Sequence, residues 1–139
     1  MSPISRILAI DYGEKRIGLA LSDPLKLFAK PLRVIPNSGF ETVLEELQKV
    51  IGEQCVELIV MGLPYAIEGG NTPKTNETIA FMDRLAAAIK TPIVAWDERY
   101  STSEAIGELI KMGYGWKQRR NFQDAMAAAM ILKSYLESL

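Results

Sequence analysis

Three carboxylates stand where a predicted strand ends or a predicted helix begins. Asp11 closes an apolar run of four residues, Glu98 follows the last predicted strand, and Asp124 falls in the first turn of the last predicted helix. A carboxylate at the end of a strand covered on both faces is costly unless it is paired, hydrated or bound to a metal. Carboxylate oxygens suit Mg²⁺, and bound divalent cations can activate water and stabilise the leaving oxygen of a phosphodiester. The acids therefore predict metal-assisted chemistry on a phosphate.

The residue types missing from the chain exclude most other catalytic systems. The sequence has no histidine, which excludes Ser-His-Asp and Cys-His nucleophilic systems, HExxH metal sites and imidazole bases. The single cysteine, Cys55, cannot form an intramolecular disulfide or a cysteine zinc site, and its position predicts a small core residue. With neither ligand type available, a hard cation is the metal that fits the chain.

Each acid also has a structural interpretation. Asp11 could be a turn-forming residue, with about even odds from position alone. Asp97 and Glu98 are adjacent and point opposite ways within a strand, so only one should face the site, while the other pairs with Arg99 or caps the next helix. Asp124 sits where a carboxylate favours the helix dipole, and spacing alone favours this structural role.

Basic residues near these acids could line a phosphate track. Lys15 and Arg16 lie on the connection between the first two predicted strands, and Lys117, Arg119 and Arg120 precede the last helix. A charge run is more often a solvated face. The formal net charge of −1 also counts against a strongly basic nucleic-acid protein, so that only a local patch could serve.

The elements that must position the acids alternate in type along the chain. Apolar patterning predicts five strands, at 7–11, 17–22, 32–35, 57–61 and 93–95. Capping signals predict helices that begin at the Ser38-x-x-Glu41 box, at Thr72-Pro73, at the Ser101-x-x-Glu104 box and at 121, the last running to 136. The order β-β-β-α-β-α-β-α-α is a mixed α/β sandwich. If the first, fourth and fifth strands are parallel neighbours, their carboxyl ends share one edge.

Length and composition predict one ordinary globular domain over 1–139. The hydrophobic share is 48% and the charged share 24%, which are typical values. No apolar run approaches the roughly 20 residues that a membrane span needs, and no targeting segment is visible, so we expect a cytoplasmic protein without a membrane partner.

Four ordered segments resemble motifs of one known family. They are ILAIDYGEKRIGLALSD at 7–23, IVMGLP at 59–64, WDERYSTSEA at 96–105 and DAMAAAMILKSYL at 124–136. Together they resemble the YqgF/RuvX family of RNase H-like proteins, described as pre-16S rRNA nucleases or Holliday-junction-resolvase homologues. The resemblance implies a mixed five-stranded sheet flanked by helices. It also implies that Asp11, Glu98 and Asp124 are the metal-binding carboxylates.

The resemblance therefore predicts a Mg²⁺- or Mn²⁺-dependent endonuclease. Asp11 would bridge the metals, with Glu98 and Asp124 completing their shell, and the candidate phosphate contacts are Lys15, Arg16, Arg99 and Arg120. The expected substrate is the 5′ end of the 16S rRNA precursor in ribosome biogenesis, with branched DNA in recombination and repair as the alternative. The expected assembly is a monomer or a homodimer.

Two rival classes stay open at this stage. An actin-like ATP-binding module also places D-x-G in a hairpin, although such proteins normally need two related domains around the nucleotide. A non-catalytic RNA-binding assembly factor could keep the same fold.

One departure from the family pattern concerns substrate contacts, because Ala66 and Glu68 stand in the loop after G-L-P where family members often carry Asn and Asp.

Overall fold

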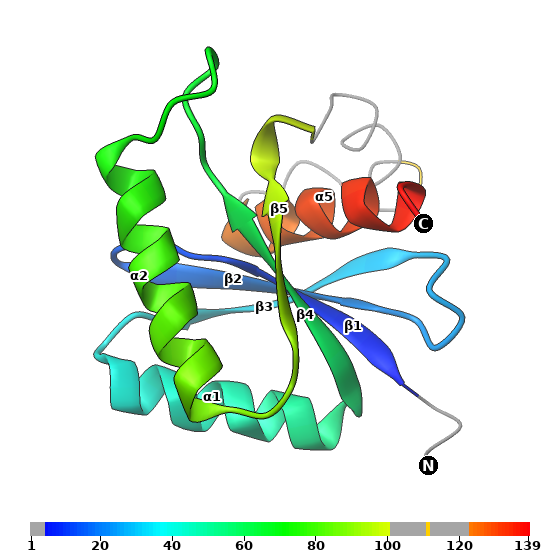
Figure 1. Ribbon diagram of the computed structural model, residues 1–139. Helices are drawn as coiled ribbons and strands as arrows, with labels where there is room; N and C mark the ends of the chain where they lie inside the picture. The colour runs from blue at the N-terminus through cyan, green and yellow to red at the C-terminus, as the bar shows by residue number, and fades with distance from the viewer. Residues whose placement is uncertain (1–4, 101–110, 112–122) are drawn as a thin grey trace.

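The fold is built on a five-stranded sheet with helices on both faces (Figure 1). The computed structural model describes residues 5–100, 111 and 123–139. The strands are β1 (Arg6–Asp11), β2 (Arg16–Ser22), β3 (Ala29–Pro36), β4 (Val56–Leu63) and β5 (Ile93–Asp97). The helices are α1 (Phe40–Glu53), α2 (Pro73–Ala88) and α5 (Gln123–Glu137), with a short 3-10 turn, η1 (Glu98–Tyr100), after β5.

The sheet is mixed, as the sequence predicts. Its order is β3-β2-β1-β4-β5, with β2 antiparallel to both β1 and β3 and with β4 parallel to both β1 and β5. Ile10 pairs with Met61, and Leu63 pairs with Asp97. The carboxyl ends of β1, β4 and β5 therefore share one edge, which confirms the arrangement needed to bring acids from distant segments together.

Side-chain alternation along β1 divides the core into two layers. Leu8 and Ile10 pack into the layer beneath α1 and α2, whereas Ile7 and Ala9 pack into the layer beneath α5. Figure 1 shows α1 and α2 on one face of the sheet and α5 on the other. By the same alternation, Asp11 at the end of β1 turns toward α5.

Helix α5 packs very closely on the sheet because both surfaces are small. Ala125, Ala128 and Ala129 are fully buried. Gly18 on β2 faces the backbone at the start of the helix, where an added Cβ would collide with the Asp124 carbonyl and lie 2.9 Å from the Ala125 nitrogen. This contact between two backbones fixes where α5 begins relative to the edge of the sheet.

The start of α2 is as predicted. Thr72 is the N-cap, its hydroxyl accepts from the Thr75 backbone N–H at 3.1 Å, and Pro73 opens the helix. The Thr75 hydroxyl also donates to the Pro64 carbonyl at 2.5 Å, which ties the helix start to the loop after β4. Helix α2 ends at Ala88.

Two local predictions were wrong. The predicted Ser38 capping box does not form: α1 begins at Phe40, and its N-cap is Gly39, whose φ of +124° favours a glycine. Cys55 is exposed and not a core residue. Its φ of +54° lies in the left-handed region, because the chain reverses there between α1 and β4.

Other predictions fall outside the residues that the structure describes. They are the helix that begins at Ser101 and the first residues of the helix predicted over 121–136. Among the described residues, no helix combines the length and the apolar character needed to cross a bilayer.

Candidate active site

Two of the three predicted acids meet at the shared edge of the sheet. Asp11 ends β1, Glu98 begins the turn after β5, and their carboxyl groups hydrogen-bond to each other. They line a cavity of about 240 Å³ with Lys74 from α2 and, from α5, Ala127, Met130 and Ile131. Strand β4 lies between β1 and β5, so sequence-distant acids converge because their strands are parallel.

Both acids of the pair have raised pKa values. Burial raises the pKa of Asp11, and the hydrogen bond from Glu98 and the charge of Lys74 oppose this rise. Burial, the nearby charge of Asp11 and the hydrogen bond with Asp11 together raise the pKa of Glu98 to about 7. Two carboxylates this close do not both ionise readily without a positive charge beside them. Asp11 and Glu98 could together hold a divalent cation, whose charge would favour their ionised forms.

Gly62 on β4 leaves the space that Glu98 occupies. A Cβ on Gly62 would lie 2.8 Å from the Glu98 Oε1 and would collide with the end of the Ile131 side chain. The glycine of the G-L-P segment therefore serves the acid pair directly, by giving room to one of its carboxyl groups.

Asp97, the neighbour of Glu98, points away from the pair. Its carboxylate accepts from the Arg99 side chain at 2.5–3.0 Å and from the Arg99 backbone N–H at 2.9 Å. The Arg99 guanidinium holds the pKa of Asp97 below its usual range. The prediction that one adjacent acid faces the site while the other binds Arg99 is confirmed.

Arg99 also fastens the loop that follows β4. Its Nη1 donates to the Ile67 carbonyl at 3.2 Å and to the Ala66 carbonyl at 3.5 Å. The loop is closed by two backbone hydrogen bonds between Ala66 and the segment 69–70. Arg99 therefore connects the end of β5 to this loop through hydrogen bonds. Ala66 takes part in them through its backbone carbonyl.

Asp124, the third predicted acid, lies beside the pair and is bound to Arg16. Its Oδ2 accepts from the Arg16 Nε at 2.8 Å, and its charge is near enough to raise the pKa of Asp11. In the described part of the chain, no three His, Cys, Asp or Glu side chains are grouped so as to hold a metal ion. The structure thus brings Asp11 and Glu98 together and holds Asp124 alongside through an ion pair.

Two predicted phosphate contacts remain, Lys15 and Arg120. Lys15 is exposed on the β1–β2 connection, next to Arg16. Arg120, with Lys117 and Arg119, lies outside the described residues. Sequence reasoning missed Lys74, whose signal was its place in the first turn of α2.

This chain is similar to known proteins along almost its whole length. The RuvX family model, described as Holliday junction resolvase, matches residues 5–138. A relative from Desulforudis audaxviator is 35% identical over 96% of this chain and 94% of its own length. One from Halothermothrix orenii is 39% identical over 94% of each chain. Both are named "Putative pre-16S rRNA nuclease".

Solved structures share the fold at low sequence identity. Thermus thermophilus RuvC in complex with a Holliday junction substrate superposes with a TM-score of 0.63 at 16% identity, covering 96% of each chain. Fowlpox virus resolvase in complex with junction DNA gives 0.58 at 13% identity, covering 96% of this chain and 97% of its own. The RNase H-like fold is therefore confirmed. Because the family model spans nearly the whole sequence and relatives match along nearly their full lengths, the chain belongs to the RuvX family of nucleases.

Proposed function

We propose that this protein is a divalent-metal-dependent endonuclease that hydrolyses phosphodiester bonds, with Mg²⁺ or Mn²⁺ held at the Asp11–Glu98 pair. The observation that carries the proposal is this pair of partly buried carboxyl groups, which hydrogen-bond to each other at the carboxyl ends of parallel strands. Family membership supports a nucleic acid as the substrate.

The residues at the pair fit a hard cation. Mg²⁺ usually takes one or two protein carboxylates, with water and substrate phosphate oxygens completing its coordination, and the cavity supplies two carboxylates. When bound, such an ion supplies charge for the phosphate and lowers the pKa of a coordinated water. Asp11 and Glu98 would hold it. Asp124 is the proposed third carboxylate, and it must first be released by Arg16.

Arg16 is well placed to exchange Asp124 for a substrate phosphate. Its side chain is 64% exposed, so leaving Asp124 costs little. Arginine binds phosphate oxygens with two parallel hydrogen bonds, which makes a phosphate a competitive partner. Binding of substrate would then free the carboxylate of Asp124 and orient the phosphate with the same residue.

Lys74 and Lys15 would supply the other basic contacts. Lys74 lines the cavity, and its charge already favours the ionised forms of both Asp11 and Glu98. Lys15 extends the basic surface along the hairpin, and we keep Arg120 as a candidate contact. We assign Arg99 to positioning the loop after β4, because reaching a phosphate would require it to leave Asp97 and the loop carbonyls.

The names of the relatives point first to precursor 16S rRNA as the substrate, and the family description points to four-way DNA junctions as the second candidate. Both are phosphodiester substrates that the same acid pair could serve. The substrate is therefore tested directly and in parallel.

The test incubates wild type and Asp11→Asn with a precursor-rRNA leader and a four-way DNA junction, in Mg²⁺, Mn²⁺ or EDTA. Wild type should cleave at least one of the two substrates, and only when Mg²⁺ or Mn²⁺ is present. Asp11→Asn should cleave neither substrate. Asp83→Asn is the matched control, because Asp83 is an exposed aspartate on α2. Failure of wild type on both substrates contradicts the proposal, and equal cleavage by Asp11→Asn removes Asp11 from the mechanism.

A further inference from the structure

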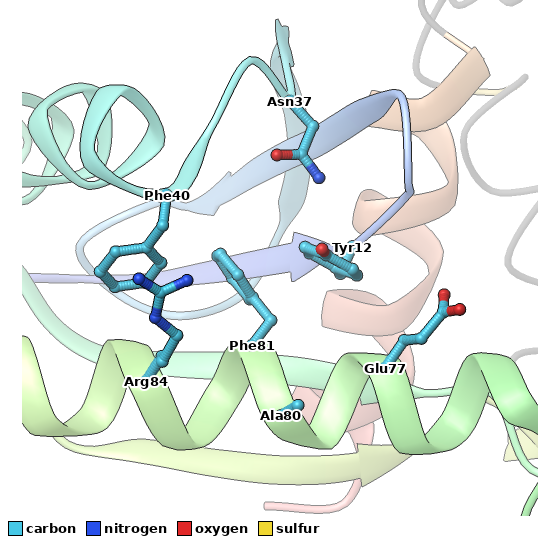
Figure 2. A pocket seen from close by; sticks show the side chains of 7 residues that line it. All are labelled: Tyr12, Asn37, Phe40, Glu77, Ala80, Phe81 and Arg84. Carbon is cyan, nitrogen blue, oxygen red and sulfur yellow. The ribbon is translucent and has the colours of Figure 1, made fainter.

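A second cavity opens on the other side of the end of β1. Its volume is about 280 Å³, and it lies between α2 and the segment that leads from β3 into α1. Figure 2 shows its side chains: Tyr12, Phe40 and Phe81 form an aromatic surface, and Asn37, Glu77 and Arg84 surround it. The mechanism proposed above uses none of these residues.

Packing between the rings holds the aromatic side chains in place. The Tyr12 ring stacks on Phe81 with centroids 4.4 Å apart, and Phe40 meets Phe81 edge-on at 6.1 Å. Phe81 is buried, whereas Tyr12 and Phe40 are only partly covered. The Arg84 guanidinium lies over the Phe40 ring at 4.1 Å, which adds a second planar group. Planar groups of this kind are what nucleic-acid bases stack on.

The polar groups at the rim have unused hydrogen-bonding capacity. The Asn37 Nδ2 donates to the Gly13 carbonyl at 2.9 Å, which fixes the amide at the mouth of the pocket. Within the described part of the chain, the Asn37 Oδ1, the Glu77 carboxylate and the N–H groups of Arg84 have no hydrogen-bond partner. The pocket therefore offers acceptors on one side and donors on the other, beside a stacking surface.

The pocket and the acid pair are neighbours through two separate elements. Asp11 and Tyr12 are consecutive, and alternation sends Asp11 toward α5 and Tyr12 onto Phe81 of α2. On α2, Lys74 lines the acid cavity and Glu77 lines the pocket, and residues three apart are neighbours on one side of a helix. A nucleotide whose phosphate lies at the acid pair therefore has its flanking base within reach of the pocket.

We propose that this pocket binds the base of an unpaired nucleotide beside the cleaved phosphate, and that guanine fits it best. The inference rests on the proposed nuclease function. A volume of about 280 Å³ lies at the small end of ligand pockets and suits one heterocycle. The negative charge of Glu77 disfavours a phosphate in the pocket itself.

Guanine matches the rim because of its own donors and acceptors. Its N1–H and N2–H₂ are adjacent donors, which the two oxygens of the Glu77 carboxylate can accept together. Its O6 and N7 are acceptors of the kind that arginine N–H groups bind, as in guanine contacts in DNA grooves. Adenine, cytosine and uracil each lack a pair of adjacent donors on one edge.

The test measures binding of short single-stranded oligo-U RNAs that carry G, A, C or U at one central position. Fluorescence anisotropy on wild type in EDTA keeps cleavage out of the measurement. The G oligonucleotide should bind about tenfold more tightly than the others. In Glu77→Gln, the affinity for the G oligonucleotide should be equal to the affinity for the other three, whatever the effect on overall affinity. Asp83→Asn on the same helix should keep the tenfold preference for G.

Substitutions at Arg84 test its hydrogen bonds to the edge of the base. Arg84→Ala should weaken binding of the G oligonucleotide by about tenfold. Arg84→Lys should lose most of the same affinity, because lysine keeps the charge but not the planar set of N–H donors. Full affinity in Arg84→Lys, or an unchanged G preference in Glu77→Gln, overturns the proposal.

The experiments distinguish a failure of the pocket assignment from a failure of the nuclease assignment. Metal-dependent cleavage together with equal affinity for all four oligonucleotides overturns the pocket assignment and leaves the nuclease assignment intact. Base-selective binding that depends on Glu77, in a protein that cleaves neither substrate, supports the pocket while contradicting the nuclease.

Discussion

Replacing Glu98 by glutamine should stabilise the metal-free protein at pH 8 while abolishing its activity. A carboxyl whose pKa is raised on folding binds its proton more tightly in the folded chain, so protonation stabilises the fold. This contribution to the free energy of unfolding is fully present below pH 4.5, the pKa of Glu98 in the unfolded chain. It is lost as the pH rises through about 7, the pKa in the folded chain. Above that pH, wild type must keep Glu98 ionised beside Asp11, whereas glutamine has no charge and can donate to Asp11.

The pKa shift sets the size of the effect. A rise from 4.5 to about 7 corresponds to about 3 kcal/mol, at about 1.4 kcal/mol per pH unit. Because Glu98 is only partly buried and shares its proton with Asp11, we expect about 2 kcal/mol at pH 8. In a chain of this length, that raises the thermal midpoint by about 6 °C.

Thermal unfolding at pH 5 and pH 8 in EDTA, followed by circular dichroism, measures the effect. The gain in Glu98→Gln should be present at pH 8 and nearly absent at pH 5, and Glu45→Gln, at an exposed site on α1, should show no such difference. An unfolding midpoint at or below that of wild type at pH 8 would refute the reasoning. So would an equal gain at both pH values.

Added Mg²⁺ extends the same experiment. A cation that binds only the folded chain raises the midpoint by mass action, and protons compete with it for the carboxylates. Wild type should therefore gain more stability from Mg²⁺ at pH 8 than at pH 6, and Glu98→Gln should gain little at either pH. Equal Mg²⁺ stabilisation of the two proteins would remove Glu98 from the metal site.

Three further substitutions test how the fold positions the acids. Gly62→Ala should displace the Glu98 carboxyl and lower the cleavage rate, with only about 1 kcal/mol lost in urea unfolding, because the atoms that the added methyl meets belong to side chains and not to the backbone. Gly18→Ala should cost about 3 kcal/mol in the same assay, because the added Cβ meets the backbone at Asp124. Arg16→Ala should change stability by less than about 0.5 kcal/mol, because the ion pair is exposed, but should raise KM in cleavage assays.

The positions of the strands could be predicted because the strand signal is local. The apolar run before Asp11 marks β1, and parallel pairing of β1, β4 and β5 then brings Asp11 and Glu98 together. Local signals failed where the backbone takes an unusual conformation. The N-cap of α1 is Gly39 and not the predicted Ser38. Cys55 is exposed because the chain reverses its direction after α1.

The partners of the charged residues could not be predicted, because they depend on contacts between distant segments. Arg16 and Asp124 are 108 residues apart in the sequence, and Arg99 binds carbonyls 32 and 33 residues away. The pocket beside Tyr12 combines β1, α2 and the start of α1. Tyr12 and Phe40 individually have only the ordinary apolar signals of core packing, so the sequence did not single out this pocket.

The negative charge of the candidate site's acids is reduced in two different ways. The raised pKa values of Asp11 and Glu98 favour protonation of one carboxyl of the pair, and the Arg16 guanidinium forms an ion pair with Asp124. A divalent cation would compete with the proton, and a substrate phosphate would compete with Asp124 for Arg16. Because Asp124 also raises the pKa of Asp11, freeing its charge strengthens the demand for a cation at the pair. Metal and substrate should therefore bind with positive coupling, each increasing the affinity for the other by the same factor.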